Sequence, residues 1–543
     1  MRPSPIAGAI LVGLLGLALY LPGLGAEIIR HPLEAKYALV AREMLEGGPR
    51  LVPHVYGELF ADKPPLYFWA TAALGWLRGG RIDEVTARLP AVAAAVATLL
   101  LVHRLGTDLF GGGAGLLAGV VLATSNLFFW YARQGHLDQF LTAFVTLACL
   151  GLWRALTATT PAQAAAWTAV AYGAMGLGVL SKGLIGLVVP LLAGATYCLA
   201  TGRIRAVPAR LRLAAGLGVF LVIVLAWFVP AVARYGPGYF YETVVHQHVV
   251  RYTRTWAHAG PWYYYFAEFP VGFFPWVLFL PSAMILGWRA REATPTGRPF
   301  LFPLAWFVSA FVFFSLATGK RGPYLLPLYP AAALLVGWLG QRMLTGLTRS
   351  RWVGVPIALM SGAAALLAVG LLVVPRRLIP GRMVHTLVPA DPGQLAAAVA
   401  LLLAGAATVW LLWRTGHAPA AFAALVAVQA VLLLVVAAVR ATQYEREFPV
   451  RAFAVRARAA VPAGQPVFSL FEDYNNIVAF YLGRPLRPLT SSAELPPADV
   501  APVFALVELR DQPSLDGRPV AVMAEATLER RRLALVRLDP PRR

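Results

Sequence analysis

Long apolar runs separated by short polar loops recur along most of the chain. A helix needs roughly 17–25 residues to cross about 30 Å of hydrocarbon. Thirteen runs reach that length, over residues 6–24, 88–105, 113–131, 137–156, 163–181, 183–201, 213–233, 264–287, 300–317, 324–342, 353–374, 394–413 and 418–438. The pattern predicts an α-helical polytopic membrane protein with about 13 transmembrane helices.

One further apolar stretch, from Leu66 to Leu77, is too short to cross a bilayer. We interpret it as an interfacial helix that lies along the membrane surface. This interpretation decides on which side of the membrane every later loop falls.

Arginine is concentrated in three short loops, which sets the predicted orientation. These loops cover residues 201–213, 287–299 and 341–352. Short loops rich in Lys and Arg stay on the inner side of the membrane. The first loop (residues 25–87) and the segment after residue 440 are therefore predicted outside. One predicted outside loop departs from the rule, with Arg376, Arg377 and Arg382.

The chain is predicted to divide into a transmembrane domain, residues 1–439, and a C-terminal domain, residues 440–543. The C-terminal segment is less hydrophobic and rich in Pro. It alternates strand-like and helix-like stretches, at Pro466–Leu470, Tyr474–Leu482, Val503–Val507 and Leu533–Leu538. This alternation predicts a small soluble α/β domain outside the membrane.

Composition agrees with a membrane protein and argues against a nucleic-acid partner. Of 543 residues, 59% are hydrophobic and 13% are charged, more apolar surface than a soluble fold of this length buries. The net charge of +21 comes from 47 Lys+Arg against 26 Asp+Glu. Much of the excess is Arg in the short inner loops, and no basic module with interleaved aromatic residues is present.

The first outside loop contains an amphipathic stretch from Glu34 to Leu45. Tyr37, Val40 and Ala41 share one face at helical spacing, and Lys36 lies on the other. We expect a helix in the headgroup region.

Other ionisable residues stand at predicted helix ends on the same side of the membrane. A single residue of this kind usually extends its charged end to the interface. Several together favour a site, because charges at membrane depth are costly. Lysine and arginine with a carboxylate and an imidazole suit a phosphorylated lipid head group. The residues are Asp138, Lys182, His246, His248, Arg251, Lys320, Arg321 and Tyr324.

An ordered set of short motifs runs through residues 1–340. It comprises Pro32–Tyr37 with Ala41–Met44, Asp62–Leu66, Ala87–Pro90, His136–Asp138 with Leu141–Phe144, Ser181–Gly183, and Lys320 with Tyr324–Pro330. In this order the motifs resemble the GT-C membrane glycosyltransferases, in the branch of the aminoarabinose–lipid A transferases and the protein O-mannosyltransferases. Beyond residue 340 only the architecture is similar.

The resemblance implies an inverting transfer of a sugar from a polyprenyl-phosphate carrier to a glycolipid or protein acceptor. The reaction would take place at the periplasmic face of the bacterial inner membrane. Lys63 and Lys182 would hold the carrier phosphate, and Tyr37 and Tyr324 would line the same cavity. The further substrate-binding candidates are Lys36, Arg251, Lys320 and Arg321.

Two details of the resemblance concern the chemistry. Asp62 and His248 are similar to a metal-binding pair, and a divalent ion there needs phosphate or water to complete its coordination. Leu33 stands where the family usually has an Asp that positions or deprotonates the acceptor. Either Glu34 or Asp138 replaces that Asp, or the acceptor needs no deprotonation, or the activity is changed or lost. Glu34 and Asp138 are the catalytic candidates.

Two other functions fit the same helices. A transporter or flippase of lipid-linked sugars would show repeated halves and broken helices near mid-membrane, and the sequence has no clear repeat. A non-catalytic membrane scaffold is consistent with Leu33.

Overall fold

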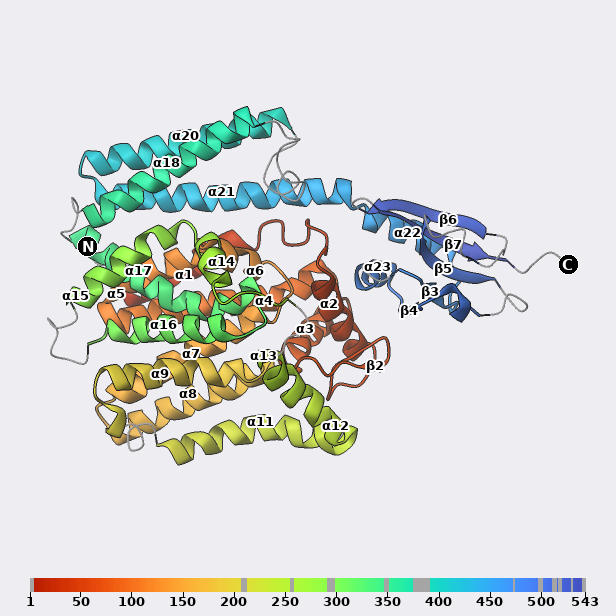
Figure 1. Cartoon of the computed structure of the whole chain (residues 1–543), viewed down its shortest axis with the longest axis horizontal. Coiled ribbons are helices and arrows are strands. Elements are labelled where there is room, and N and C mark those ends of the chain that lie inside the picture. The colour runs from red at the N-terminus through yellow and green to blue at the C-terminus, as the bar shows by residue number, and fades with distance from the viewer. Residues whose placement is uncertain are drawn as a thin grey trace.

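The computed structural model describes residues 4–206, 212–253, 258–290, 298–345, 351–374, 391–471, 474–496, 502–509, 515, 520–528 and 531–539. Helices dominate the chain up to residue 460 (Figure 1). The first half contains α1 Pro5–Tyr20, α2 Pro32–Leu45, α3 Leu66–Leu77, α4 Glu84–Phe110, α5 Gly112–Ala123, α6 Asn126–Ala132, α7 Asp138–Thr157, α8 Pro161–Lys182, α9 Ile185–Ala200, η1 Ile204–Ala206, α11 Leu213–Tyr235, α12 Pro237–Phe240, η2 Tyr241–Val250 and α13 Arg251–Thr253. The second half contains α14 Tyr264–Gly272, η3 Trp276–Phe279, α15 Leu280–Ala290, α16 Leu301–Leu316, η4 Gly322–Leu328, α17 Tyr329–Thr345, α18 Arg351–Val373, α20 Pro392–Arg414, α21 Ala418–Glu447 and α22 Val450–Ala460.

The helices make this a multi-pass membrane protein. Among the described residues, eight helices are long and apolar enough to cross a bilayer, or ten when each of two bent helix pairs is one span. The bent pairs are α5 with α6, at 70°, and α14 with η3 and α15, at 110°. The other three predicted spans coincide with the shorter apolar helices α1, α9 and α16. The exact number of 13 therefore stays a prediction, although a helix or bent pair lies at each predicted position.

The first loop folds into short elements against the end of the helical bundle. Helix α2 begins where His31 accepts a hydrogen bond from the Leu33 N–H and Pro32 takes the first helical position. Tyr37, Val40 and Ala41 are buried on its inner face, as the spacing predicted. A hairpin of β1 (His54–Val55) and β2 (Glu58–Leu59) follows. Helix α3 has the bounds predicted for the interfacial helix.

The C-terminal region forms a five-stranded sheet with helices. Its elements are β3 Val467–Ser469, α23 Asn475–Leu482, β4 Leu486–Pro488, η6 Ser492–Glu494, β5 Val503–Glu508, β6 Val520–Leu528 and β7 Arg531–Leu538. The strand order is β4-β3-β5-β7-β6, parallel among the first three and antiparallel after that. The three predicted strands and the helix are present, whereas β4 and β6 were missed. The division of the chain at residue 440 stays a prediction, and α21 continues to Glu447.

The C-terminal region packs against the same end of the bundle as the first loop (Figure 1). Both regions contribute to one buried apolar cluster. Tyr481 donates a hydrogen bond of 3.0 Å to Glu84 at the start of α4 and is hydrogen-bonded to the Ile29 N–H at 2.7 Å. Arg42 on α2 donates to the Phe480 carbonyl. Helix α2 of the first loop thus packs between the helical bundle and α23 of the C-terminal region.

Candidate active site

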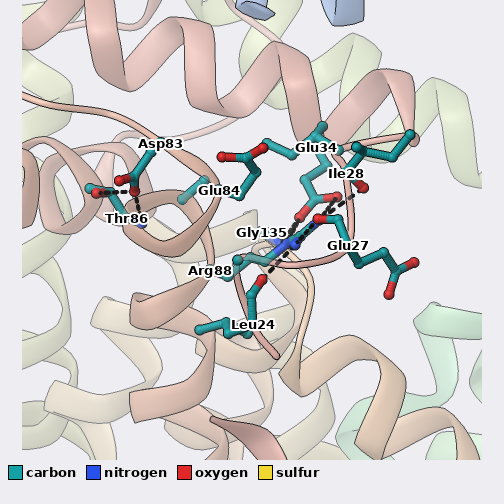
Figure 2. Close-up of polar contacts among 12 residues, drawn as sticks. Leu24, Glu27, Ile28, Glu34, Asp83, Glu84, Thr86, Arg88 and Gly135 are labelled. Carbon is teal, nitrogen blue, oxygen red and sulfur yellow. Dashed lines mark hydrogen bonds and ion pairs between the residues drawn. The ribbon is translucent and has the colours of Figure 1, made fainter. Parts of the chain in front are cut away.

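A buried ion pair fixes the first loop to α4 (Figure 2). The Glu34 carboxylate accepts hydrogen bonds from Arg88 Nε at 2.7 Å and from the Gly135 N–H at 2.8 Å. Arg88 also donates to the backbone carbonyls of Leu24, Glu27 and Ile28. Both side chains are about 3% exposed. One arginine therefore joins α4 to the loop between α1 and α2.

This pair decides how Glu34 behaves chemically. Burial alone raises the pKa of its carboxyl, but the charge and hydrogen bonds of Arg88 outweigh burial and hold the pKa below its ordinary value. Its oxygens already accept from Arg88 and Gly135. A carboxylate held this way is a weak proton acceptor, so the contacts of Glu34 fit a positioning role better than the predicted catalytic one.

A second ion pair, which is partly buried, joins Asp138 to Lys182. Asp138 is the first residue of α7, and Lys182 is the last residue of α8. The two helices pack side by side, so both residues come to one end of the hairpin, where each charge complements its helix dipole. Helix α8 stops at Gly183, whose φ of 95° favours glycine. The Lys182 ammonium donates to Asp138 Oδ1 and lies 5.0 Å from the centre of the Tyr324 ring.

Tyr37 lies at the centre of the charged side chains. Burial raises the pKa of its hydroxyl, and so do the charges of Asp138 and Asp62, while the charge of Arg321 lowers it. These residues come from α2, the start of α7, the loop before α3 and the segment before η4. The structure thus brings together most of the predicted site residues, which lie far apart in the sequence.

The Asp62–Lys63 loop is held in place from two sides. The Lys63 ammonium donates to the backbone carbonyl of Asp62 at 2.9 Å. The Asp62 carboxylate accepts from the Gln247 side chain on η2 at 3.3 Å. Burial lowers the pKa of the nearby Lys36, which the charge of Asp62 opposes, and the Lys36 ammonium lies 4.3 Å from the centre of the Phe60 ring.

Lys320 and Arg321 differ in their surroundings although they are neighbours in sequence. The buried Lys320 ammonium donates to the carbonyls of Phe314, at 3.0 Å, and Ser315, at 2.6 Å, and also to Ala317. An ammonium has three protons, so all of them are used at the end of α16. The predicted contact of Lys320 with substrate therefore does not fit its position, which is that of a helix cap.

Arg321 faces the site instead. Its backbone N–H and carbonyl are both hydrogen-bonded to the Tyr265 hydroxyl, at 3.2 and 3.3 Å. Its positive charge lowers the pKa values of His31 and His136. Glu268 lies beside the next residue, Gly322, where a Cβ atom would come within 2.3 Å of its Oε1. No motif or spacing in the sequence singles out Glu268.

The remaining predictions concern η2 and α13. The side chains of His248 and Arg251 lie outside the described residues, so their predicted roles stay predictions. No group of three or more His, Cys, Asp and Glu side chains that would hold a metal ion occurs among the described residues. The donors described around Asp62 are therefore too few for a closed metal site.

The chain has only four lysines, Lys36, Lys63, Lys182 and Lys320, and all lie at this end of the bundle. Every other basic side chain, apart from histidine, is arginine. Lysine carries a compact, strongly hydrated charge, whereas arginine suits fixed ion pairs. This restriction was visible in the sequence and would have marked the site without any motif.

A separate cavity of about 640 Å³ lies between the first loop and the C-terminal region. Its lining includes Arg42, Glu43, Tyr56, Arg484 and Arg487. Its lining includes none of the predicted site residues, so this cavity is separate from the candidate active site.

The arrangement of helices defines the class of protein. ArnT from Cupriavidus metallidurans, solved bound to undecaprenyl phosphate, has a TM-score of 0.80 with the chain over 97% of both proteins, at 24% identity. An oligosaccharyltransferase from Archaeoglobus fulgidus has a TM-score of 0.52, covering 94% of this chain and 70% of that one, at 11% identity. The chain is therefore a multi-pass membrane protein with the GT-C fold.

Sequence comparison identifies particular relatives. Residues 62–229 match the family described as dolichyl-phosphate-mannose-protein mannosyltransferase. The undecaprenyl phosphate-alpha-4-amino-4-deoxy-L-arabinose arabinosyl transferase of Edwardsiella ictaluri is 30% identical over 340 residues, 62% of this chain and 60% of that protein. A transferase of the same name from Pseudomonas fluorescens is 32% identical over 359 residues, 64% and 62% of the two proteins. The chain thus spans about three fifths of these relatives, and the predicted resemblance to this group is confirmed.

Proposed function

We propose that the protein is an inverting glycosyltransferase that moves a sugar from a polyprenyl-phosphate carrier to an acceptor at the periplasmic membrane face. The observation that carries the proposal is the gathering of Lys182, Arg321 and two tyrosines around Asp138, from segments far apart in the chain. Asp62, to which Lys63 is hydrogen-bonded, acts on the same Tyr37. The names of the relatives support an undecaprenyl-phosphate donor and a lipid A-like acceptor. A protein acceptor is the second candidate, from the match to the mannosyltransferase family.

The cations act on the leaving group. As the bond between the sugar and the carrier phosphate breaks, the phosphate gains a negative charge. Lys63, Lys182 and Arg321, with Arg251 as a further predicted contact, stabilise that charge without reorganising during the reaction. Lys182 enters the site already paired with Asp138, so Asp138 sets the position of the ammonium. Glu34 and Lys320 position the loop and η4 through their buried contacts.

The sidedness is part of the proposal. The first loop, the ends of α7 and α8, and the C-terminal sheet lie at one end of the bundle (Figure 1). The described residues of the arginine-rich loops lie at the other end of the bundle, which agrees with a cytoplasmic position under the positive-inside rule. An active site and C-terminal domain in the periplasm of a bacterial inner membrane follow from this orientation.

Purified protein should transfer radiolabelled sugar from undecaprenyl phosphate-4-amino-4-deoxy-L-arabinose, or from undecaprenyl-phosphate mannose, to lipid A or to a Ser/Thr-containing peptide. Lys63→Ala and Lys182→Ala should each lower the rate by a factor of about 10²–10³, because each removes charge from the leaving phosphate. Arg104→Ala, at the opposite end of α4, is the matched control and should keep the full rate. Unchanged transfer by both lysine variants would disprove the site.

A divalent ion held by Asp62 and His248 is a separate proposal. Its support is the resemblance alone, and no step above depends on it. Loss of transfer in EDTA that is restored by one divalent metal, together with loss of that metal from Asp62→Asn, would support it. Full activity in EDTA would exclude it.

The transporter and scaffold alternatives are less favoured. The two bent helix pairs are similar to broken transporter helices, but the predicted site residues lie in the first loop and near the ends of other helices. Counterflow of undecaprenyl phosphate in proteoliposomes without sugar transfer would reverse this preference.

A further inference from the structure

A histidine at the centre of the site has a buried nitrogen without a partner. His136 lies in the loop between α6 and α7, and its residue is 3% exposed. Its Nε2 atom makes no hydrogen bond with any described residue. Leaving a buried polar atom without a partner costs free energy, so the open position requires an explanation, such as a bound water or a substrate group. Other buried side-chain atoms, such as His103 Nδ1, also have no hydrogen-bond partner among the described residues. His136 differs from them because it lies among the side chains of the proposed active site.

The neighbours of His136 are side chains of the proposed active site. Its ring lies 5.1 Å from the ring of His31, 5.8 Å from that of Tyr37 and 5.3 Å from that of Tyr131. The negative charges of Asp138 and Glu34 raise the pKa of His136, and the positive charge of Arg321 lowers it. The backbone N–H beside it, that of Gly135, is bound to Glu34. His136 therefore occupies the space between the two ion pairs.

Both predicted catalytic carboxylates are already neutralised. Glu34 is paired with Arg88 and Asp138 with Lys182. The Nδ1 atom of His31 accepts from the Leu33 N–H as the cap of α2. Nε2 of His136, by contrast, is buried and has an open hydrogen-bonding position. Burial and the charge of His31 lower the pKa of His136 to about 4, so its imidazole is neutral at neutral pH. The negative charge of a bound donor phosphate favours the imidazolium and raises this pKa, which makes Nε2 a stronger proton acceptor when the donor is bound.

The remaining charges favour one phosphate in the site. Outside the two ion pairs, Arg321 and Asp62 act on Tyr37 with their charges. Lys36 and Lys63 lie beside Asp62, and Glu268 lies beside Gly322, so the site holds three cations and two carboxylates besides the pairs. A single net positive charge matches one phosphodiester, which the donor supplies. Arg251 is not counted, because its side chain lies outside the described residues. A second phosphate, on the acceptor, would meet no further cation among these residues.

We propose that the acceptor group is a neutral hydroxyl, and that His136 Nε2 binds this hydroxyl and takes its proton during transfer. The inference rests on the proposed function and adds the chemical class of the acceptor. The acceptor O–H bond breaks toward Nε2, the oxygen forms a bond to the anomeric carbon, and the bond from that carbon to the phosphate oxygen breaks. The carrier leaves as a phosphate monoester, which receives the proton from the imidazolium directly or through water.

The test compares two acceptors and two histidine variants. The acceptors are lipid A and lipid A whose phosphates have been removed, which keeps only hydroxyl groups. His136→Gln retains a hydrogen-bonding side chain but cannot carry a proton. Its matched control is His103→Gln, because His103 is an equally buried histidine with an unpartnered nitrogen, in α4 far from the site. Binding of undecaprenyl phosphate and thermal unfolding are measured on every protein.

We expect the wild-type protein to glycosylate the dephosphorylated acceptor. His136→Gln should lower kcat by a factor of about 10²–10⁴, with undecaprenyl-phosphate binding unchanged, while His103→Gln keeps full activity. His136→Asn is the second variant, should His136→Gln fail to fold, and is expected to show the same loss of kcat. Transfer to phosphate groups alone, or a folded His136 variant within threefold of the wild-type rate, would overturn the inference and leave the proposed function intact. Absence of both undecaprenyl-phosphate binding and transfer in the wild type would instead disprove the proposed function.

Discussion

The two ends of the helical bundle differ in how deeply their ion pairs are buried. At the site end, both side chains of Glu34–Arg88 are about 3% exposed, and those of Asp138 and Lys182 are 6% and 15% exposed. At the opposite end, Asp108 on α4 is shared by Arg154 of α7, a pair in which the side chains are 18% and 19% exposed, and by Arg104, whose side chain is 55% exposed. A buried ion pair has little net stability to offer, because desolvation offsets the attraction. The burial of Glu34–Arg88 therefore indicates that this ion pair positions the first loop.

The largest effect should come from removing one partner of a buried pair. Arg88→Ala leaves three backbone carbonyls without the arginine that donates to them and leaves the Glu34 carboxylate without its countercharge, with only the hydrogen bond from the Gly135 N–H. We expect a loss of about 3–5 kcal/mol in the free energy of unfolding, together with loss of transfer. Unfolding in mixed detergent and SDS micelles measures the stability. A loss below about 1 kcal/mol in the free energy of unfolding would mean that water reaches the Glu34–Arg88 ion pair in the folded protein.

Substitutions of Lys320 and Arg321 test whether Lys320 has a structural role and Arg321 a substrate-binding role. Lys320→Met keeps the buried stem but leaves the carbonyls at the end of α16 unpaired. We expect the free energy of unfolding to fall by roughly 2–3 kcal/mol, with the donor KM of the folded protein unchanged. Arg321→Met should show the reverse, a raised donor KM at nearly unchanged stability. If Lys320→Met raises the donor KM instead, the result supports the prediction that Lys320 contacts the substrate.

The low pKa of His136 predicts a pH dependence confined to the site end. The unfolded histidine binds a proton below a pKa of 6.5, while the folded one does so only below about 4. The unfolded state therefore binds more protons in this window, and stability falls as the pH falls from about 6.5 toward 4. Between pH 7 and 5 the loss should be about 2 kcal/mol.

His136→Gln should remove this part of the pH dependence. His31, whose pKa is also lowered by burial and Arg321, remains in the variant and contributes in the same direction. The difference between the wild-type and variant curves is therefore the measured quantity. Parallel curves would show that the His136 imidazole is protonated as easily in the folded protein as in the unfolded one.

The sequence predicted the positions of the helices better than the roles of single residues. Helix α3 has the predicted bounds, because an apolar run between Pro65 and Arg78 has little choice of ends. Lys320 and Arg321 could not be told apart, because their difference comes from how the chain turns between α16 and η4. Glu34 is adjacent to Leu33 in a recognisable motif, but its partner Arg88 lies 54 residues away. The open nitrogen of His136 becomes visible only when the surrounding residues are in place.

The smallest effect on stability should come from a substitution at the end of the bundle opposite the candidate active site. Arg104 and Asp108 form an i,i+4 pair at 3.3 Å on α4. Exposed pairs of this kind contribute about 0.3–0.5 kcal/mol, because water screens the charges and ordering long side chains costs entropy. Arg104→Ala also leaves Asp108 with its two hydrogen bonds to Arg154, so no buried carboxylate loses its only partner. We therefore expect a loss below about 0.5 kcal/mol in the same SDS unfolding measurement. A loss above about 1 kcal/mol would remove the distinction between the two ends, because a half-exposed arginine would then stabilise the fold as a buried one does.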